Sequence, residues 1–220
     1  MRFLIPLSLI MSILTAQYDQ LFVGTRPLGM GGAFIAVADD ANTITWNPAG
    51  LPGLRRTEFT STYANLYNMG ITQSYVGFVR PFSDRIALGL DWSNVGYDDN
   101  ELSYGENKLN LAVGVQPTKL FSFGLTLKYL MRDMLLDEAS YGKSSGIGYD
   151  AGFLIQPLKN LKLGLGLYDL GGTSVSYKDK TSETILGQAF KLGISYMPLN
   201  GLTIAGDFGD RFHLGAEYIL

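Results

Sequence analysis

Cysteine is absent from the 220 residues, and histidine occurs once. Without cysteine the chain has neither a disulfide framework nor a thiolate metal site. Charged residues are also scarce, at 17% of the chain against about a quarter in ordinary soluble domains. The net charge of −3 is small and the Lys and Arg residues are scattered, so nothing indicates a nucleic-acid-binding protein.

Long hydrophobic runs are missing except at the N-terminus. Met1 and Arg2 precede an apolar segment over residues 3–14, and Ala16 supplies a small residue shortly after it. This pattern predicts a secretory signal peptide cleaved after Ala16. The alternative, an uncleaved anchor, fits less well because a membrane-spanning helix needs ~20 apolar residues. We therefore divide the chain into a signal peptide (1–16), an N-terminal segment (17–56) and a strand-rich region (57–220).

Glycine and aromatic residues are abundant, with 27 glycines and 12% aromatics. From about residue 57, apolar residues alternate with small or polar ones: Leu109 and Leu111 fall on one face, and Asn110 and Ala112 on the other. A period of two residues predicts strands with one apolar face and one small or polar face. Ten strands are predicted, over residues 57–67, 71–81, 85–95, 107–117, 121–132, 147–157, 160–170, 187–198, 201–208 and 211–219.

Four prolines recur about forty residues apart, at positions 81, 117, 157 and 198. Proline lacks the N–H that a strand ladder uses and fixes φ for a turn, so each is expected to end a strand before a tight turn. The connections at the other end, 96–106, 133–146 and 171–186, are long and polar. Short turns at one end and long loops at the other are typical of transmembrane β-barrels, whose short turns are periplasmic and whose long loops are extracellular.

The fold predicted is therefore all-β: a transmembrane antiparallel up-and-down β-barrel of about ten strands in the outer membrane of a double-membraned bacterium, with outer-membrane lipids as partners. The alternative is a soluble β-sandwich. It fits less well because the second face of the strands is mostly Gly, Ala and Ser rather than Thr, Lys and Glu. The charged residues expected to face inward are Asp91, Lys128, Arg132, Lys162, Lys191 and Glu217.

The N-terminal segment is the least strand-like part of the mature chain. Apolar residues recur in it every three or four positions, close to the helical period, which predicts a helix with an apolar stripe. They are Met30, Phe34, Val37, Ala41 and Ile44. The helix should stop at about Trp46, because the residue before Pro48 is disfavoured in the helical region. Numerous Gly and Ala residues make the segment slim. We expect a short helical hatch in the periplasmic mouth of the barrel; a short strand over residues 33–37 is the alternative.

The pattern GxGGAxxAxADDA, followed after five residues by NPAGL, resembles the N-terminal signature of the outer-membrane family that includes the FadL-type transporters of hydrophobic compounds. It looks closer still to the PorV/PorQ-like branch of that family. The resemblance implies a fourteen-stranded barrel with an N-terminal hatch. For the PorV-like branch it implies an accessory or scaffold role in protein secretion; the alternative is FadL-like passive transport of small hydrophobic molecules. The hatch motif comprises Gly29, Gly31, Gly32, Asp39, Asp40, Asn47, Pro48, Ala49 and Gly50.

The ten predicted strands are fewer than the fourteen of that family. Ten strands leave little room for an internal helix, since eight are just filled by side chains. Two explanations stay open at this point. Either the hatch sits below the mouth of a ten-stranded barrel, or the chain is an incomplete fourteen-stranded barrel.

Other chemistry has little support in the sequence. The Gly-rich run lacks the Lys-Ser/Thr of a phosphate-binding loop. Asp39 and Asp40 are adjacent, which disfavours a shared metal site. A place on the helix surface, or pairing with a Lys or Arg inside the barrel, is the expected role. The acidic loop residues Asp98, Asp99 and Glu101 are oxygen ligands of the kind Ca²⁺ takes, but a solvated loop is the simpler interpretation.

His213 and Ser195 lie on similar non-apolar faces, but no nucleophile motif or third member accompanies them. We therefore expect no enzyme activity, no catalytic residue, no metal and no cofactor. The expected partners are secretion-system proteins or a small hydrophobic molecule, and not nucleic acid.

Overall fold

The structure of the protein is a computed structural model that describes residues 23–66, 68, 70–98, 102–136, 139–177 and 180–219. The signal peptide predicted for residues 1–16 lies outside this part of the chain. So do Asp99 and Glu101 of the acidic loop.

In the described part of the chain, three short helical elements precede the strands: α2 (Thr25–Gly29), α3 (Thr43–Trp46) and the 3₁₀ helix η1 (Pro48–Gly53). The strands are β1 (Glu58–Leu66), β2 (Ile71–Ser83), β3 (Ile86–Asp98), β4 (Leu102–Thr118), β5 (Phe121–Leu136), β6 (Ala139–Leu158), β7 (Leu161–Tyr168), β8 (Thr173–Tyr177), β9 (Lys180–Leu186), β10 (Ala189–Leu199), β11 (Leu202–Phe208) and β12 (Phe212–Tyr218). All ten predicted strands are present, so the all-β prediction is confirmed.

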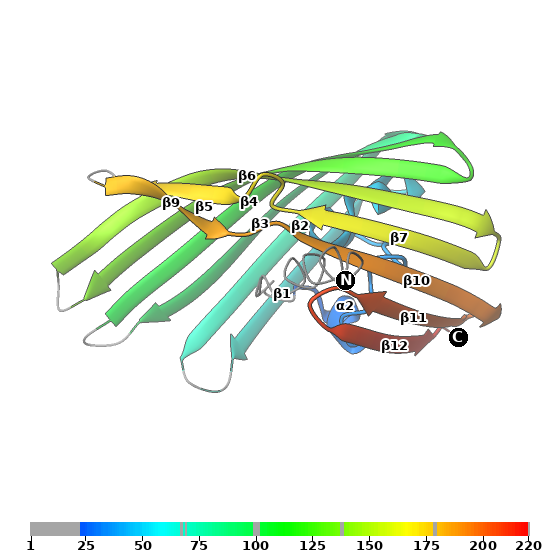
Figure 1. Ribbon diagram of the computed structural model, residues 1–220. Coiled ribbons are helices and arrows are strands. Elements are labelled where there is room, and N and C mark those ends of the chain that lie inside the picture. Colours follow the sequence, from blue (N-terminus) through cyan, green and yellow to red (C-terminus); the bar gives the residue numbers. More distant parts are fainter. Residues whose placement is uncertain are drawn as a thin grey trace, which may run out of the picture.

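The strands form one antiparallel sheet in the order β1-β2-β3-β4-β5-β6-β7-β10-β11-β12, while β8 pairs with β6 and β9. This is the predicted up-and-down topology. Within the described residues, β1 pairs only with β2 and β12 only with β11, so the sheet is open between these two edges. Figure 1 shows α2 between β1 and β12, with the long strands β2–β6 on one side and the shorter β10–β12 on the other.

The prediction of three long polar loops is wrong for the described residues. The segments predicted as loops 96–106 and 133–146 largely continue β3–β4 and β5–β6 as paired strands, and most of the third folds as β8 and β9. Polar residues on both faces hide the alternation there, but they pair across the ladder. Arg132 lies opposite Glu106 and contacts it at 2.6 Å, a cross-strand ion pair of the kind that stabilises a sheet.

The prediction for the recurring prolines is confirmed. Each lies next to a hairpin turn, and in each hairpin the register shifts there, as at Pro117 between Val115 and Thr118. The residue before Pro117, Gln116, donates its backbone N–H to the carbonyl of Arg85 in the neighbouring turn at 2.8 Å. Each register shift thus places proline, which has no N–H, where the hydrogen-bond ladder between the strands is already interrupted.

The two faces of the sheet also follow the predicted alternation. Asp91 and Lys128 are buried on the inner face, which we define as the face that contacts the N-terminal segment. Leu111 and Leu125 point the other way and are each 52% exposed. Apolar side chains of this kind cover the outward side of most strands, whereas a soluble protein rarely exposes a large apolar patch. The distribution is that of a barrel wall facing lipid.

Candidate functional site

The hatch, defined here as residues 23–54, packs against the inner face of the sheet. Residues 33–38 are each at most 2% exposed. The predicted helix over residues 30–44 is wrong, since only Thr43–Trp46 is helical there, and the alternative strand over 33–37 is also absent from this described segment. The segment is instead a series of turns, including one closed by the Ala38 N–H on the Phe34 carbonyl at 3.0 Å.

Side chains from the strands form the hydrogen bonds that the backbone of the hatch would otherwise have made within a helix. The carboxylate of Asp207 in β11 accepts the backbone N–H groups of Phe34 at 2.7 Å and Ile35 at 2.9 Å. From β5, Ser122 donates its hydroxyl to the Ala49 carbonyl at 2.7 Å. Buried backbone groups must find partners, and here the wall supplies them. The hatch is therefore held in an irregular conformation by residues far away in the sequence.

Asn47 occupies the centre of the hatch and is fully buried. α3 ends at Trp46, as predicted, and Asn47 is extended with φ −161° and ψ 100°. Its Nδ2 donates to the carbonyls of Ile35 at 2.8 Å and Phe153 at 3.3 Å, and its Oδ1 accepts the Ala49 N–H at 3.1 Å. One side chain thus connects two parts of the hatch with β6.

Glycine on the inner face makes room for the hatch. A Cβ atom at Gly164 would lie 2.5 Å from the Ile35 carbonyl oxygen, and one at Gly114 would lie 2.6 Å from Cδ of Pro52. The same close approach occurs at Gly89, Gly124, Gly152, Gly193 and Gly215. Because the hatch touches strand backbone directly, it fits along the inner face and does not sit below the mouth. This explains much of the glycine excess.

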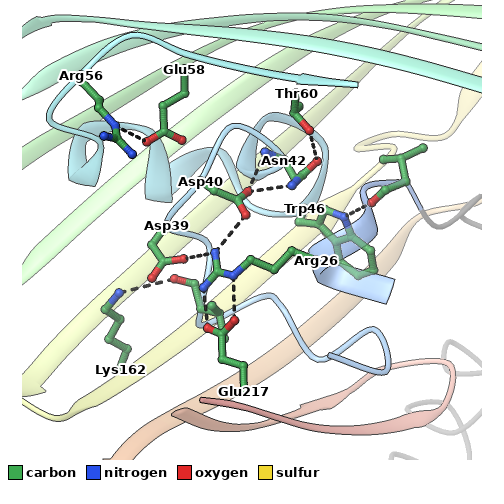
Figure 2. Close-up of polar contacts among 12 residues, drawn as sticks. Arg26, Asp39, Asp40, Asn42, Trp46, Arg56, Glu58, Thr60, Lys162 and Glu217 are labelled. Atoms are coloured by element: carbon green, nitrogen blue, oxygen red, sulfur yellow. Dashed lines mark hydrogen bonds and ion pairs between the residues drawn. The ribbon is translucent and has the colours of Figure 1, made fainter. Parts of the chain in front are cut away.

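Arg26 is the charged centre of the hatch (Figure 2). Its Nε and Nη2 contact the two carboxylate oxygens of Glu217 in β12 at 2.8 and 2.5 Å, and its Nη1 contacts Asp39 at 2.6 Å and Asp40 at 2.9 Å. Burial opposes the charge on Arg26. The hydrogen bonds and charges of the three carboxylates outweigh this effect and raise the pKa of the guanidinium above its ordinary value. Arg26 therefore stays charged.

A chain of hydrogen bonds continues from Arg26 to the opposite edge of the sheet (Figure 2). Asp40 accepts the backbone N–H and the side-chain amide of Asn42 at 2.8 and 2.9 Å. Thr60 in β1 donates to Oδ1 of Asn42 at 3.2 Å. We call the chain from Glu217 through Arg26, Asp40 and Asn42 to Thr60 the latch. It joins β12 to β1, the two strands whose outer edges are unpaired in the described structure.

The residues of the predicted hatch motif have different surroundings. Asp39 and Asp40 pair with Arg26, which belongs to the hatch and not to a strand of the barrel. Gly31 and Gly32 have positive φ values of 60° and 81°, a conformation that favours glycine. Gly29 would meet nothing within 4 Å if it carried a Cβ. Pro48, Ala49 and Gly50 form η1, which packs on β2–β6.

The motif did not include Arg26, which lies before Gly29, the first glycine of the motif. The partner of Arg26, Glu217, is 191 residues away in the sequence. The available signal was charge: Arg26 is the one basic residue between Arg2 and Arg55, so the acidic pair Asp39-Asp40 had a single nearby cation. Among the described residues, no group of three or more His, Asp or Glu side chains is placed to hold a metal.

A second buried polar cluster lies where β7 ends. Lys128 contacts Asp150 at 2.7 Å and Asp169 at 2.6 Å, and Thr173 donates to Asp169 at 2.5 Å. The chain turns at residues 169–172: β6 pairs with β7 along one half and with β8 along the other. The inner charged residues predicted from sequence are thus partly neutralised by buried acids.

An apolar cavity of about 400 Å³ lies beside this interruption. It is lined mainly by outward-facing residues of β3–β6 and by Leu170 from the turn. Leu170 keeps the wall connected through its N–H, which donates to the Tyr149 carbonyl at 2.9 Å. The wall therefore carries a hydrophobic recess next to a polar inner cluster. In the described part of the chain, no helix has the length and apolar character needed to cross a membrane.

Several solved structures have a similar fold, and three of them are described here. The structure described as "CymD monoaromatic hydrocarbon channel" has a TM-score of 0.63 and 15% identity, over 87% of this chain and 69% of that chain. "TodX monoaromatic hydrocarbon channel deltaS2 mutant" has a TM-score of 0.63 and 13% identity, over 86% and 69%. A Pseudomonas aeruginosa FadL homologue has a TM-score of 0.57 and 11% identity, over 84% and 67%.

No protein-family model matches this sequence, and the search of curated proteins finds no match. At 11–15% identity, the structural likeness establishes the fold alone. The PorV/PorQ-like branch implied by the hatch motif is not confirmed by these neighbours. The chain has the β-barrel fold of the FadL-type outer-membrane channels, with its sheet open between β1 and β12.

Proposed function

We propose that this protein is an outer-membrane β-barrel protein that lets small hydrophobic molecules cross the membrane, with the hatch as its gate. One observation carries the proposal. The hatch occupies the inner face of a fold shared with structures described as monoaromatic hydrocarbon channels, and the latch fastens it to both β1 and β12. The apolar outward faces and the signal peptide predicted for residues 1–16 support the location.

In this proposal residues 17–56 form the N-terminal domain that contains the hatch, and residues 57–220 form the barrel. The short proline turns and the N-terminus face the periplasm, and the hairpin tips at the other end of the strands face the outside. The hatch motif from Gly29 to Gly50 shapes the gate. Asp39 and Asp40 hold Arg26, and Asn47-Pro48 leads the chain out toward β1.

The closed hatch blocks the interior with packed side chains. Phe34 and Trp46 meet edge to face with ring centroids 6.0 Å apart, and Tyr168 from β7 donates its hydroxyl to the Trp46 carbonyl at 2.5 Å. A solute that follows the inner face must displace this cluster. The latch beside it is less deeply buried, since the Arg26 side chain is 29% exposed. Partly exposed ion pairs exchange with water at modest cost, so the latch can open without unpairing the strands.

The apolar recess near Leu170 supports the same function. Its volume of about 400 Å³ lies within the range of small-molecule pockets, and its walls are almost entirely aliphatic and aromatic. A small hydrophobic molecule that moved from water into this recess would lose unfavourable contact with water, and the recess opens on the outward, apolar side of the wall. A secretion scaffold, by contrast, has no specific support beyond the hatch motif, so transport is the better-supported function.

Uptake by reconstituted protein tests the proposal. Liposomes that contain the protein should accumulate toluene, as a monoaromatic probe, faster than empty liposomes prepared in parallel. A hatch-deletion variant lacking residues 24–54 should accumulate it faster still if it assembles. Equal uptake by protein-containing and empty liposomes would contradict transport. Extraction of the mature protein from outer membranes by urea or carbonate alone would contradict the membrane location.

A further inference from the structure

A second cavity, of about 290 Å³, lies at the proline-turn end of the sheet. The hatch forms one wall through Ala38, Ala49 and Gly50, and β5 and β6 form another through Ser122 and Leu154. Leu120, Phe121 and Ile155 also line it. Ile155 is exposed on the apolar side of the sheet, and Leu120 is exposed in the turn before β5. The cavity thus reaches from the hatch to the rim of the outward apolar face.

The cavity has a surplus of positive charge. Arg55, Lys119 and Lys162 line it, and none of the three forms an ion pair within the described part of the chain. Among the described lining residues Asp39 is the one acid, and its carboxylate contacts Arg26 at 2.6 Å. Lys162 extends toward the hatch, with its ammonium 3.4 Å from the Val37 carbonyl.

Polar neutral groups complete the lining. Gln116 and Gln156 are half-buried beside the cations, one at each of two successive proline turns. The Gln156 amide already donates to the Lys159 carbonyl at 3.1 Å. Because each amide has two N–H donors, both side chains can still donate a hydrogen bond to an anion. Three cations, two amides and an adjoining apolar rim fit an anion attached to a hydrophobic chain better than a fully soluble anion.

We propose that this cavity binds the headgroup phosphate of an anionic phospholipid from the periplasmic leaflet. The acyl chains would lie on Leu120, Phe121 and Ile155, and the phosphate would contact Arg55, Lys119 and Lys162. Basic pockets near a membrane surface bind anionic headgroups in this way. A volume of about 290 Å³ is at the small end of ligand pockets, which suits a headgroup and not a whole lipid.

The site has a consequence for the gate. Because Ala38, Ala49 and Gly50 of the hatch form one wall, a lipid bound to Lys119 and Lys162 holds the hatch against β5–β7. Anionic lipid therefore favours the closed hatch. This inference rests on the proposed membrane location, but it does not depend on which solute the channel carries.

Native mass spectrometry of the detergent-solubilised protein tests the site. Phosphatidylglycerol and phosphatidylcholine are added at equal concentrations, and the retained adducts are compared. The wild type should retain more phosphatidylglycerol. Arg55→Gln and Lys119→Gln should each reduce that retention about fivefold, as expected for one cation near a membrane surface. The matched control is Arg85→Gln: Arg85 lies in the neighbouring proline turn but not in the cavity, so its retention should equal that of the wild type.

The outcomes separate the alternatives. Equal retention of the two lipids, or a loss in Arg85→Gln as large as in Lys119→Gln, overturns the lipid site and leaves the transport proposal intact. Displacement of the lipid by an equal concentration of inorganic phosphate overturns it in favour of a free phosphate site. A protein that stays soluble without detergent contradicts both proposals. Unchanged urea midpoints for the variants show that folding is preserved.

Discussion

Replacing Arg26 by glutamine perturbs the latch directly. Glutamine keeps a polar side chain, but it removes the charge that three carboxylates share and the paired contact with Glu217 at 2.8 and 2.5 Å. A hydrogen bond to a charged group contributes about 1.5–3 kcal/mol when buried. Exposed ion pairs contribute about 1 kcal/mol or less. Because the Arg26 side chain is 29% exposed, we take an intermediate value of about 2 kcal/mol for the loss.

A loss of about 2 kcal/mol changes an equilibrium about thirtyfold. Arg26→Gln should therefore raise the population of the released hatch by about that factor, with the strands still paired. The absence of cysteine allows a clean assay. Cysteine introduced at Ala41, which is 2% exposed in the closed hatch, should react with maleimide at a rate proportional to the released population.

Arg56 provides the matched control for this substitution. It carries the same side chain and follows the hatch motif, whereas Arg26 precedes it. Arg56 is 85% exposed, and its one ion pair within the described residues is with Glu58, at 3.6 Å. In the Ala41→Cys background, Arg56→Gln should label at the parental rate while Arg26→Gln labels about thirtyfold faster. Equal labelling of the two variants would refute the idea that the latch holds the hatch closed.

Three further substitutions test other parts of the structure. Gly114→Ala should lower the free energy of unfolding by about 1–3 kcal/mol, because the added methyl group overpacks against η1. Gly105→Ala on the same strand should leave the free energy of unfolding unchanged, because a Cβ there meets nothing within 4 Å. Equal urea midpoints for the two variants would contradict the close hatch contact. Lys128→Met leaves two buried carboxylates without their cation and should lower the free energy of unfolding by about 3–5 kcal/mol. Lys143→Met removes an ion pair whose lysine is 73% exposed and should lower it by under about 1 kcal/mol. Similar thermal melts for the two variants would exclude the buried cluster. Leu127→Arg places a charge on the outward face and should destabilise the protein in bilayers by about 2–4 kcal/mol; an unchanged unfolding curve would argue against a lipid-facing wall.

Local sequence was sufficient to predict the ten strands of the meander, although not β8 and β9. Alternation such as Leu109-Asn110-Leu111-Ala112 repeats every two residues and needs no knowledge of distant parts of the chain. The prolines locate the turns for an equally local reason, since the missing N–H and restricted φ belong to the residue itself. Where both faces are polar, as around Glu106 and Arg132, this signal disappears, and the length of the hairpins could not be predicted.

The hatch shows the opposite case. Its small residues and Asn47-Pro48 predicted a slim segment that ends before β1, and this is confirmed. The apolar spacing predicted a helix, which is wrong because Asp207, 173 residues beyond Phe34, takes the backbone N–H groups that a helix would use.

By itself, the sequence determined the strand count along the meander, the direction of the apolar face and the place of the turns, because each depends on neighbouring residues. The tertiary structure alone decided the conformation of the hatch, the pairing of Arg26 with Glu217 and the two cavities. Those features depend on which side chains of distant strands meet on the inner face of the folded sheet, and a period of two residues carries no information about that.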